Sequence, residues 1–286
     1  MSTCLIAYFS LGGTTARVAE SIATGLRADE YQVDLCNIKD AKPPDPGGYD
    51  LLGIGLPAYY FSPPVNVMDY LNSLPDLNGL PAFVFVVHGT LPGDTGTITR
   101  RLLAQKGAKD AGYFQCHGAD FFLGYLKEGY FFSPDHPTEK ELHEAEEFGR
   151  KVAAAKAGQE YSRPKDDPGL GFIYRMEQFL MNPWLIRNVY GRMFTVKKDK
   201  CTACGLCMKE CPTGNISADK EGRPVWGHNC LLCVNCEMKC PENAIKSPVS
   251  WPIFHPTILY NVYQASRDSS VDHVRVKHDR GTTSRV

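Results

Sequence analysis

Eight of the eleven cysteines in this chain lie between Cys201 and Cys240. They form two runs of the pattern C-x2-C-x2-C-x3-C-P, and the second run repeats the first after 29 residues. Residues 201–216 align with residues 230–245 at every cysteine, at the following proline and at the closing isoleucine. The first residues of the chain show no secretion signal. Closely spaced cysteines in such a chain predict metal ligation rather than disulfides. The repeat predicts a pseudo-twofold domain with two equivalent sites.

Thiolates at these spacings suit iron–sulfur clusters. Three thiolates at three-residue steps wrap one side of a cubane, and the local loop cannot comfortably supply the fourth corner. In the bacterial two-cluster arrangement, the fourth cysteine of each run therefore ligates the other cluster. The expected ligands of one cluster are Cys201, Cys204, Cys207 and Cys240, and those of the other are Cys230, Cys233, Cys236 and Cys211.

Zinc and disulfides are the alternatives for these cysteines. A zinc site would show paired C-x2-C units with a longer gap between them, and disulfides need an oxidising compartment. No histidine lies inside either run, which disfavours a Rieske-type centre. The segment 196–248 resembles the bacterial two-[4Fe–4S] ferredoxins. The resemblance implies a small α+β domain of the βαββαβ type and one-electron transfer at low potential.

The first part of the chain alternates short apolar strands with helical stretches. Strands are expected at 3–9, 31–37, 51–56, 83–88 and 113–116, and helices near 14–28, 65–74, 95–106 and 138–157. Continuous apolar runs are typical of strands buried on both faces of a parallel sheet. The alternation therefore predicts an α/β fold with a doubly wound parallel sheet.

Three loops follow strands of this expected sheet. The first, Ser10–Thr15, is rich in glycine and hydroxyls and opens a helix, so its backbone N–H groups could hold an anion. It differs from the dinucleotide and Walker motifs, and alone it could be an ordinary strand–helix turn with a hydroxyl cap. Because ligands bind beyond the carboxyl ends of parallel strands, it should meet the loops at 55–60 and 88–94. Tyr59 or Tyr60 could stack on a planar ring there.

Residues 1–158 resemble the flavodoxins, on the SLGGTT turn, the aromatic residues after Pro57 and the glycine-rich third loop. The resemblance implies a five-stranded sheet of order 2-1-3-4-5 and an FMN cofactor. Its phosphate would lie on Ser10, Gly12, Gly13, Thr14 and Thr15, and the rest of the flavin on Pro57, Ala58, Tyr59, Tyr60, His88, Gly89, Thr90 and Gly93. The first loop departs from the usual T-x-T-G-N-T pattern, and His88 stands where acidic residues are common. His88 is either a cation beside the flavin or a hydrogen-bonded histidine at a strand end, and the second is favoured.

Four segments are expected along the chain: an FMN-binding domain (1–158), a linker with interdomain helices (159–195), a cluster domain (196–248) and a C-terminal tail (249–286). The polar stretch 158–169 marks the first boundary. The aromatic stretch after it, broken at Pro183, predicts two short helices that pack between the domains rather than on a membrane surface. The tail should be loose from Ser266 onward.

Several further side chains could take part in chemistry. Cys4, Cys36 and Cys116 fall on expected strands, which favours buried, inert thiols. The three histidines at 117, 136 and 143 show no ligand spacing. The aromatic run 121–132 could cover the flavin or a partner site, but core packing is favoured.

The whole chain resembles the flavodoxin–ferredoxin fusions known mainly from anaerobic bacteria and archaea, which implies an electron carrier between FMN, two [4Fe–4S] clusters and redox partner proteins. The alternatives are a flavin-dependent reductase of a small molecule, with the clusters as an internal wire, and a redox sensor acting through its tail. A net charge of −1 argues against a basic nucleic-acid binder. No apolar run is long enough for a bilayer, so a cytoplasmic protein is expected, with homodimer formation left open.

Overall fold

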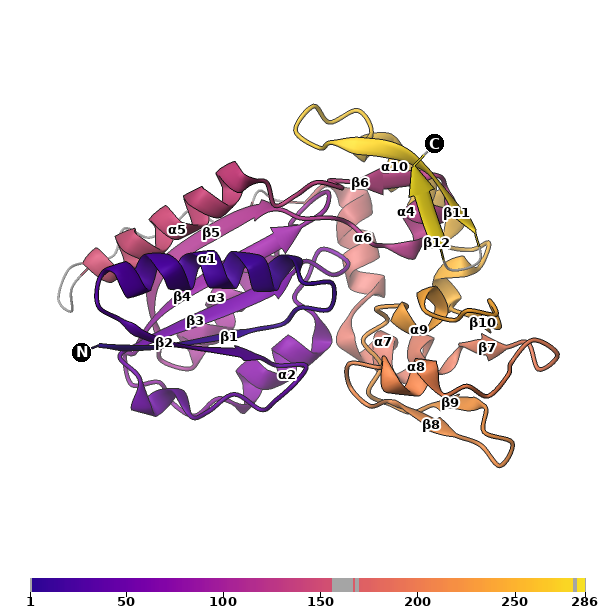
Figure 1. The fold of residues 1–286 in the computed structure, drawn as a ribbon, viewed down its shortest axis with the longest axis horizontal. Coiled ribbons are helices and arrows are strands. Elements are labelled where there is room, and N and C mark those ends of the chain that lie inside the picture. Colours follow the sequence, from indigo (N-terminus) through magenta and orange to yellow (C-terminus); the bar gives the residue numbers. More distant parts are fainter. Residues whose placement is uncertain (1, 156–166, 168–169, 280–281, 286) are drawn as a thin grey trace. The chain divides into compact units, whose positions relative to one another are not determined.

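The computed structural model describes residues 2–155, 167, 170–279 and 282–285 (Figure 1). These residues form two compact units. The first unit contains Met1–Ala119 and Asp135–Tyr174, and the second contains Asp120–Pro134 and Arg175–Val286. The boundary expected at 158–169 lies outside the described residues except for Asp167. The four-segment division stays a prediction, and the two units differ from it at residues 120–134.

The first unit is built on a five-stranded sheet of order β2-β1-β3-β4-β5. All four strand pairs are parallel. The strands are β1 (Thr3–Tyr8), β2 (Gln32–Asn37), β3 (Leu51–Pro57), β4 (Pro81–His88) and β5 (Lys109–His117). The register pairs Tyr8 with Gly55, Pro57 with Val87 and His88 with His117. The carboxyl ends therefore meet at one edge of the sheet, and the fold class and strand order predicted from the sequence are confirmed.

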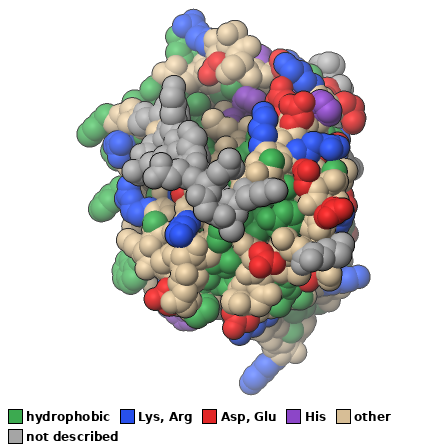
Figure 2. Space-filling view, turned by 90° about the vertical axis from the view of Figure 1, so that its left-hand side faces the viewer, with side chains coloured by type: hydrophobic (Ala, Val, Ile, Leu, Met, Phe, Trp, Pro, Cys, Tyr) green, Lys and Arg blue, Asp and Glu red, His purple; other side chains and the backbone are tan. Residues whose placement is uncertain are grey.

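Helices flank this sheet, with α1 (Thr14–Ala28) and α5 (Glu139–Ala154) side by side (Figure 1). The other two are α2 (Val65–Ser73) and α3 (Thr95–Gln105), and a short 3-10 turn, η1, spans Pro46–Gly48. A Cβ on Gly25 would lie 2.0 Å from the carbonyl oxygen of Glu146, and one on Gly149 would lie 2.3 Å from that of Ile22. The two glycines thus let the backbones of α1 and α5 touch. Figure 2 shows acidic and basic side chains interspersed on the face that it views.

The second unit contains the cysteine repeat. Its elements are β7 (Thr195–Val196), α8 (Leu206–Lys209), β8 (Ile216–Ala218), β9 (Pro224–Trp226), α9 (Asn235–Met238) and β10 (Ile245–Lys246). Strand β7 pairs antiparallel with β10, and β8 pairs antiparallel with β9. Three left-handed positions recur 29 residues apart: Ala203 with Leu232 (φ 53° in both), Gly205 (76°) with Val234 (52°), and Gly214 (60°) with Asn243 (47°). The two copies therefore have the same local backbone, as the repeat predicts.

The aromatic run 121–132 also belongs to the second unit. It forms α4 (Leu123–Lys127) and β6 (Tyr130–Phe132), and β6 pairs antiparallel with β11 (His273–Asp279). Strand β11 pairs in turn with β12 (Thr282–Arg285). Phe132 is fully buried, so core packing is the use of this run. The expectation of a loose chain from Ser266 is wrong for β11 and β12, because Val274 and Val276 give that segment the alternation of a strand.

The remaining helices lie beyond residue 170, and the first of them begins inside the first unit, which runs to Tyr174. They are α6 (Phe172–Leu180), α7 (Pro183–Asn188), the turns η2 (Tyr190–Arg192) and η3 (Pro248–Ser250), and α10 (His255–Ala265). The break at Pro183 is as predicted. Phe172, Phe179 and Trp184 are exposed, and packing of these helices between the domains stays a prediction. None of the helices in the described part of the chain is long and apolar enough to cross a membrane.

Candidate functional sites

The SLGGTT loop lies at the carboxyl edge of the sheet, between β1 and α1. Gly13 precedes the helix in a left-handed conformation (φ 88°) and makes no side-chain cap of its own. No described atom lies within 4 Å of the position a Cβ on Gly13 would take. Ser10 is buried, and its Oγ accepts a hydrogen bond from the N–H of Ala16 (3.3 Å). A helix start with open space before it fits a phosphate.

Asn37, which belongs to no motif of the sequence, fixes this loop. Its Oδ1 accepts from the N–H of Ser10 (3.2 Å), and its Nδ2 donates to the carbonyl of Ser10 (3.0 Å). Both bonds together hold the backbone of Ser10 in one orientation. A polar residue at the carboxyl end of β2 was the available signal, because that end lies beside the loop in a parallel sheet.

The second loop turns sharply after Pro57. Tyr59 and Ser62 exchange two backbone hydrogen bonds (2.9 and 3.0 Å), and Tyr60 and Phe61 between them are both left-handed (φ 51° and 62°). Glycine or asparagine is usual at such positions, and a bulky residue there costs about 1–3 kcal/mol. The surroundings must therefore hold this turn in place. Tyr59 lies edge-on to Phe9 at the end of β1, with ring centroids 6.1 Å apart.

The third loop supplies that support. The N–H of Asp94 donates to the carbonyl of Phe61 (3.1 Å), and Gly93 is left-handed (φ 59°) beneath it. A Cβ on Gly93 would lie only 2.4 Å from the Cβ of Phe61. Gly93 therefore allows the second and third loops to touch. The structure brings all three predicted loops together, and their contacts with FMN stay a prediction.

Three histidines form a row at the same edge of the sheet. The rings of His88 and His117 are 4.5 Å apart, and those of His117 and His136 are 5.5 Å apart. The Nδ1–H of His88 donates to the carbonyl of Thr90 (3.3 Å). Burial, aided by His117, lowers the pKa of His88 to about 3. His88 is therefore neutral near pH 7 and is the hydrogen-bonded strand-end histidine favoured from the sequence.

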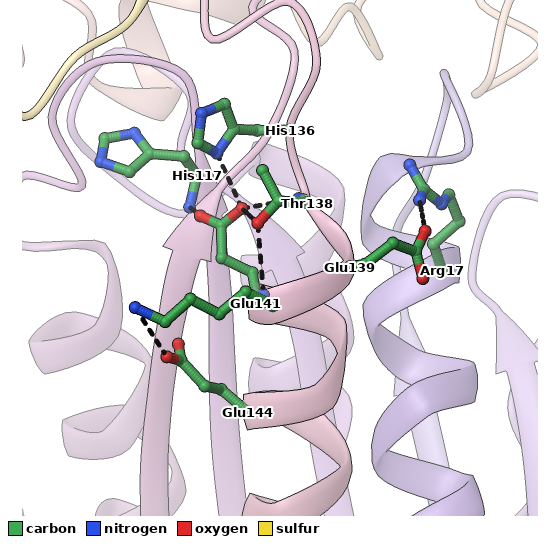
Figure 3. A network of polar contacts seen from close by, with 8 residues as sticks. Arg17, His117, His136, Thr138, Glu139, Glu141 and Glu144 are labelled. Atoms are coloured by element: carbon green, nitrogen blue, oxygen red, sulfur yellow. Dashed lines mark hydrogen bonds and ion pairs between the residues drawn. The ribbon is translucent and has the colours of Figure 1, made fainter.

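Glu141 closes this row (Figure 3). It accepts hydrogen bonds from the N–H of His117 (3.1 Å), from His136 Nδ1 (2.7 Å) and from the N–H of Thr138 (2.7 Å). The last bond is half of a capping box that starts α5. Burial by itself raises the pKa of Glu141, but the bonds from Thr138 and His136 outweigh it and hold the pKa below its usual value. The row was missed from the sequence because its members lie on separate elements.

The first set of predicted cluster ligands lines one cavity. Its walls include Cys201, Cys204 and Cys207 from the first run and Cys240 from the second. Burial raises the pKa of Cys207, and the neighbouring thiols of Cys204 and Cys240 raise it further. Cys240 therefore lies beside the first run, as the crossed pattern requires.

The second set is more buried. Burial raises the pKa of Cys233 to about 12 and that of Cys230 to about 11, and the Cys211 thiol raises both. Burial also holds the pKa of Cys236 well above its usual value, and Cys211 adds to this. Such thiols ionise only when a positive centre compensates their charge, as iron does in a cluster. Each predicted set of four is thus brought together, and cluster ligation by these cysteines stays a prediction.

Backbone N–H groups point at several of these sulfur atoms. Asn215 donates to Cys211 Sγ and Ala244 donates to Cys240 Sγ, each at 3.3 Å, at equivalent positions of the two copies. Leu232 donates to Cys230 Sγ, also at 3.3 Å. Donors to sulfur stabilise negative charge on cluster ligands. Within the described residues, no group of three or more His, Cys, Asp or Glu side chains is arranged to hold a single metal ion.

All eleven cysteines are free thiols. Cys4 and Cys116 are buried in the sheet, as predicted, and Cys36 is half-buried. Burial raises the pKa of Cys116 to about 12 and that of Cys4 still further. These thiols are therefore poor nucleophiles and lie apart from the cysteine repeat in the sequence.

Comparison with known proteins finds a match for a domain in each part of the chain. The family model of the flavodoxin domain matches residues 5–121, and that of the 4Fe-4S binding domain matches residues 194–217. A ferredoxin of Chlorobaculum thiosulfatiphilum is 38% identical over 53 residues, which are 16% of this chain and 87% of that protein. The DNA-directed RNA polymerase subunit Rpo3 of Methanosarcina acetivorans is 38% identical over 60 residues, which are 20% of this chain. The chain spans 23% of that subunit.

Solved flavodoxins are similar to part of this chain. A flavodoxin from the domain Archaea superposes with a TM-score of 0.42 at 18% identity, over 53% of this chain and 96% of its own. The flavodoxin of Streptococcus pneumonia TIGR4 gives 0.44 at 18% identity, over 54% of this chain and 100% of its own.

The matched domains are those of electron-transfer proteins. The first unit carries a flavodoxin domain, whose cofactor is FMN, and the second carries a ferredoxin-type domain for a [4Fe–4S] cluster. The chain is a flavodoxin–ferredoxin fusion.

Proposed function

We propose that this chain is an electron carrier that holds FMN in the first unit and two [4Fe–4S] clusters in the second, and exchanges electrons with redox partner proteins. FMN takes up two electrons and can release them singly, and each cluster takes one. The covalent link between the units raises the effective concentration of each unit for the other, so electron transfer between them is intramolecular. The thiol-rich second unit suits a reducing compartment, which supports a cytoplasmic location.

The observation that carries the proposal is the crossed arrangement of the cysteines. Cys240 lines the cavity of the first run, and Cys211 raises the pKa values of thiols in the second run. A domain that held only one cluster would need only one of these two cysteines beside the other run. The recurring left-handed positions and N–H···S bonds support two equivalent sites.

The first unit's residues fit FMN in chemical terms. The backbone of Gly13 and the start of α1 would hold the phosphate, with the hydroxyls of Thr14 and Thr15 beside it. Tyr59 or Tyr60 would contact the ring, and the neutral His88 would add no charge. A proposed carrier role also agrees with the sequence, in which no catalytic acid or nucleophile is evident.

Cofactor analysis of the purified protein tests this proposal. We expect one FMN and eight iron atoms per chain, and a stepwise anaerobic reduction should bleach the flavin and produce two interacting cluster signals in EPR. Cys240→Ser should cost about half of the iron, because it removes one ligand of the first set, whereas the control Cys116→Ser should keep all of it. Four iron atoms in the wild type, or full iron in Cys240→Ser, would contradict the two-cluster proposal. Steady turnover of a small molecule faster than with free FMN would favour a reductase instead.

A further inference from the structure

The two ligand loops of the cysteine repeat differ in their exposure to solvent. In the first loop, residues 202–204 are all exposed, and they include the predicted ligand Cys204. The residues that align with Thr202 and Ala203 after 29 positions are Leu231 and Leu232, and both leucines are buried. An approaching molecule therefore reaches the first ligand set more easily than the second.

The exposed loop has small side chains and packs against a neighbouring turn. Thr202 and Ala203 are both short, so a partner can come close to the ligand sulfur atoms. Ala203 is left-handed (φ 53°), and a Cβ on Gly222 would lie only 3.2 Å from the Cβ of Ala203. The turn at 219–223 therefore supports the loop. Because electron transfer slows steeply as the distance grows, a low and fixed surface over a cluster suits exchange with another protein.

Three lysines stand directly before the first ligand run. Residues 197–200, here called the lysine turn, read KKDK and are all exposed, whereas the equivalent residues 226–229 read WGHN. The N–H of Lys197 donates to the carbonyl of Ala244 (2.8 Å), whose own N–H donates to Cys240 Sγ (3.3 Å). The carbonyl of Lys197 accepts from the N–H groups of Lys200 (3.1 Å) and Cys201 (3.0 Å). The lysine turn is therefore held beside two predicted ligands of the first set.

The other charges around the loop do not add to this positive patch. The turn at 219–223 carries two basic and two acidic residues, with Arg223 Nη1 3.9 Å from Glu221 Oε2. Glu242 is exposed and lines the cavity of the first ligand set. The excess of positive charge therefore lies in the lysine turn, which has three lysines and one aspartate. Four thiolates make a bound cluster negative overall, so an acidic protein can approach it best beside such a patch.

We propose that the loop 202–204 and the lysine turn form the docking surface for a separate one-electron redox protein that carries carboxylates around its cofactor. Electrons enter and leave this chain through the first cluster. One electron passes between the partner's cofactor and the cluster, so that one is oxidised as the other is reduced, and no bond or proton changes place. The inference rests on the proposed function, because it requires a cluster on the first ligand set. The second cluster, whose loop is buried, exchanges electrons with the first cluster rather than with the partner.

Stopped-flow reduction of the intact holoprotein tests the inference with two one-electron donors of opposite charge. Reduced methyl viologen is a cation, and reduced sulfonatopropyl viologen has the same ring system but is an anion. The triple variant combines Lys197→Gln, Lys198→Gln and Lys200→Gln. It should slow cluster reduction by the anionic donor and speed reduction by the cationic donor, each about 3- to 5-fold at ~10 mM ionic strength, for three unit charges about 10 Å from the donor in water. Both differences should disappear at ~1 M salt, where the Debye length is ~3 Å.

A control variant removes the same amount of charge elsewhere. It replaces three exposed lysines of the first unit by glutamine: Lys42, Lys140 and Lys151. The rates of cluster reduction by both donors should stay as in the wild type. An equal effect in the control and in the triple variant would mean that only the net charge of the chain matters, and would overturn the docking surface.

A second variant leaves every lysine in place. Thr202→Glu adds a negative charge to the exposed loop and should likewise slow the anionic donor and speed the cationic one. Polyglutamate, a polypeptide of carboxylates alone, should slow reduction of the wild type by the anionic donor and have little effect on the triple variant. No slowing of the wild type by polyglutamate would overturn the acidic partner.

The iron content separates the two proposals. A wild type with only four iron atoms would overturn the proposed function. Eight iron atoms, with the same donor rates in the wild type, the triple variant and Thr202→Glu, would overturn the docking surface alone. Slower exchange between clusters and flavin in the triple variant, at unchanged donor rates, would assign the lysines to transfer within the chain and would also overturn the docking surface.

Discussion

Replacing Gly13 by alanine separates the cost of a backbone conformation from the cost of a lost ligand contact. Gly13 has a φ of 88°, and no described atom lies within 4 Å of the position of the new Cβ. The methyl group therefore meets no protein atom in the ligand-free chain. What remains is the left-handed conformation, which costs a residue with a Cβ about 1–2 kcal/mol.

That cost sets the expected magnitude. If the loop of Gly13→Ala relaxes in the free protein, FMN must restore the left-handed conformation when it binds. The dissociation constant should then rise by about 5- to 30-fold, since each 1.4 kcal/mol is a factor of ten. Contact between the methyl group and the phosphate would increase the loss.

Titration of the flavin-free protein with FMN, followed by quenching of flavin fluorescence, measures this constant. Gly79→Ala is the matched control: Gly79 has a φ of 81°, and its Cβ would lie 3.4 Å from the flexible end of Lys109. Urea unfolding of the flavin-free proteins should show a loss of about 1 kcal/mol in Gly79→Ala and a smaller loss in Gly13→Ala, whose loop relaxes. Only Gly13→Ala should bind FMN more weakly. Equal FMN affinities in the two variants would refute the assignment of the phosphate to this loop.

Two predictions concern buried carboxylates. Glu141→Gln should lower the free energy of unfolding by about 1–2 kcal/mol at pH 7, because it weakens the capping box and the bond to His136. The pKa of Glu141 is lower in the folded protein than its usual 4.5, so the stabilisation by this carboxylate is present above pH 4.5 and disappears as the pH falls through the folded-state pKa. The free energies of unfolding of wild type and variant, measured in urea, should therefore converge in acid. A difference that stays constant with pH would contradict this. Lys127→Met should cost about 2 kcal/mol in thermal unfolding, because Glu237 is 4% exposed and loses its 2.6 Å partner. The exposed pair of Lys140 and Glu144 gives the control, Lys140→Met, for which a loss below about 0.5 kcal/mol is expected.

Much of the fold could be predicted because its signals are local. Continuous apolar runs identified the strands of the sheet, and the 29-residue repeat identified the pseudo-twofold unit with its crossed cysteines. Spatial neighbours without a shared spacing could not be found in this way. His88 and His117 end two strands and His136 precedes a helix, so only the folded sheet brings their rings together.

The grouping of the run 121–132 with the second unit has no local signal in the sequence, for a related reason. Its apolar residues would fit the core of either unit, and its strand partner β11 lies far along the chain. The alternation in HVRVKHD was a signal for β11 itself, but it does not say which strand it pairs with. The capping-box pattern T-x-x-E at Thr138 was also recognisable in the sequence and marks the start of α5. Its glutamate, Glu141, is the residue that accepts hydrogen bonds from His117 and His136.

The pairing of β6 with β11 also sets the order in which the chain can fold during synthesis. Residues 130–132 leave the ribosome about 140 residues before residues 273–275, to which they bond. At a rate of ~5–20 residues per second, that interval lasts about 7–28 s. Throughout this interval the aromatic strand Tyr130–Phe132 has no β11 edge to join, whereas the parallel sheet, whose five strands all precede it in the sequence, can already form. The nascent chain must therefore keep an apolar loop shielded until translation is almost finished, and a ribosome that stalls before β11 would release a polypeptide prone to aggregate through that loop.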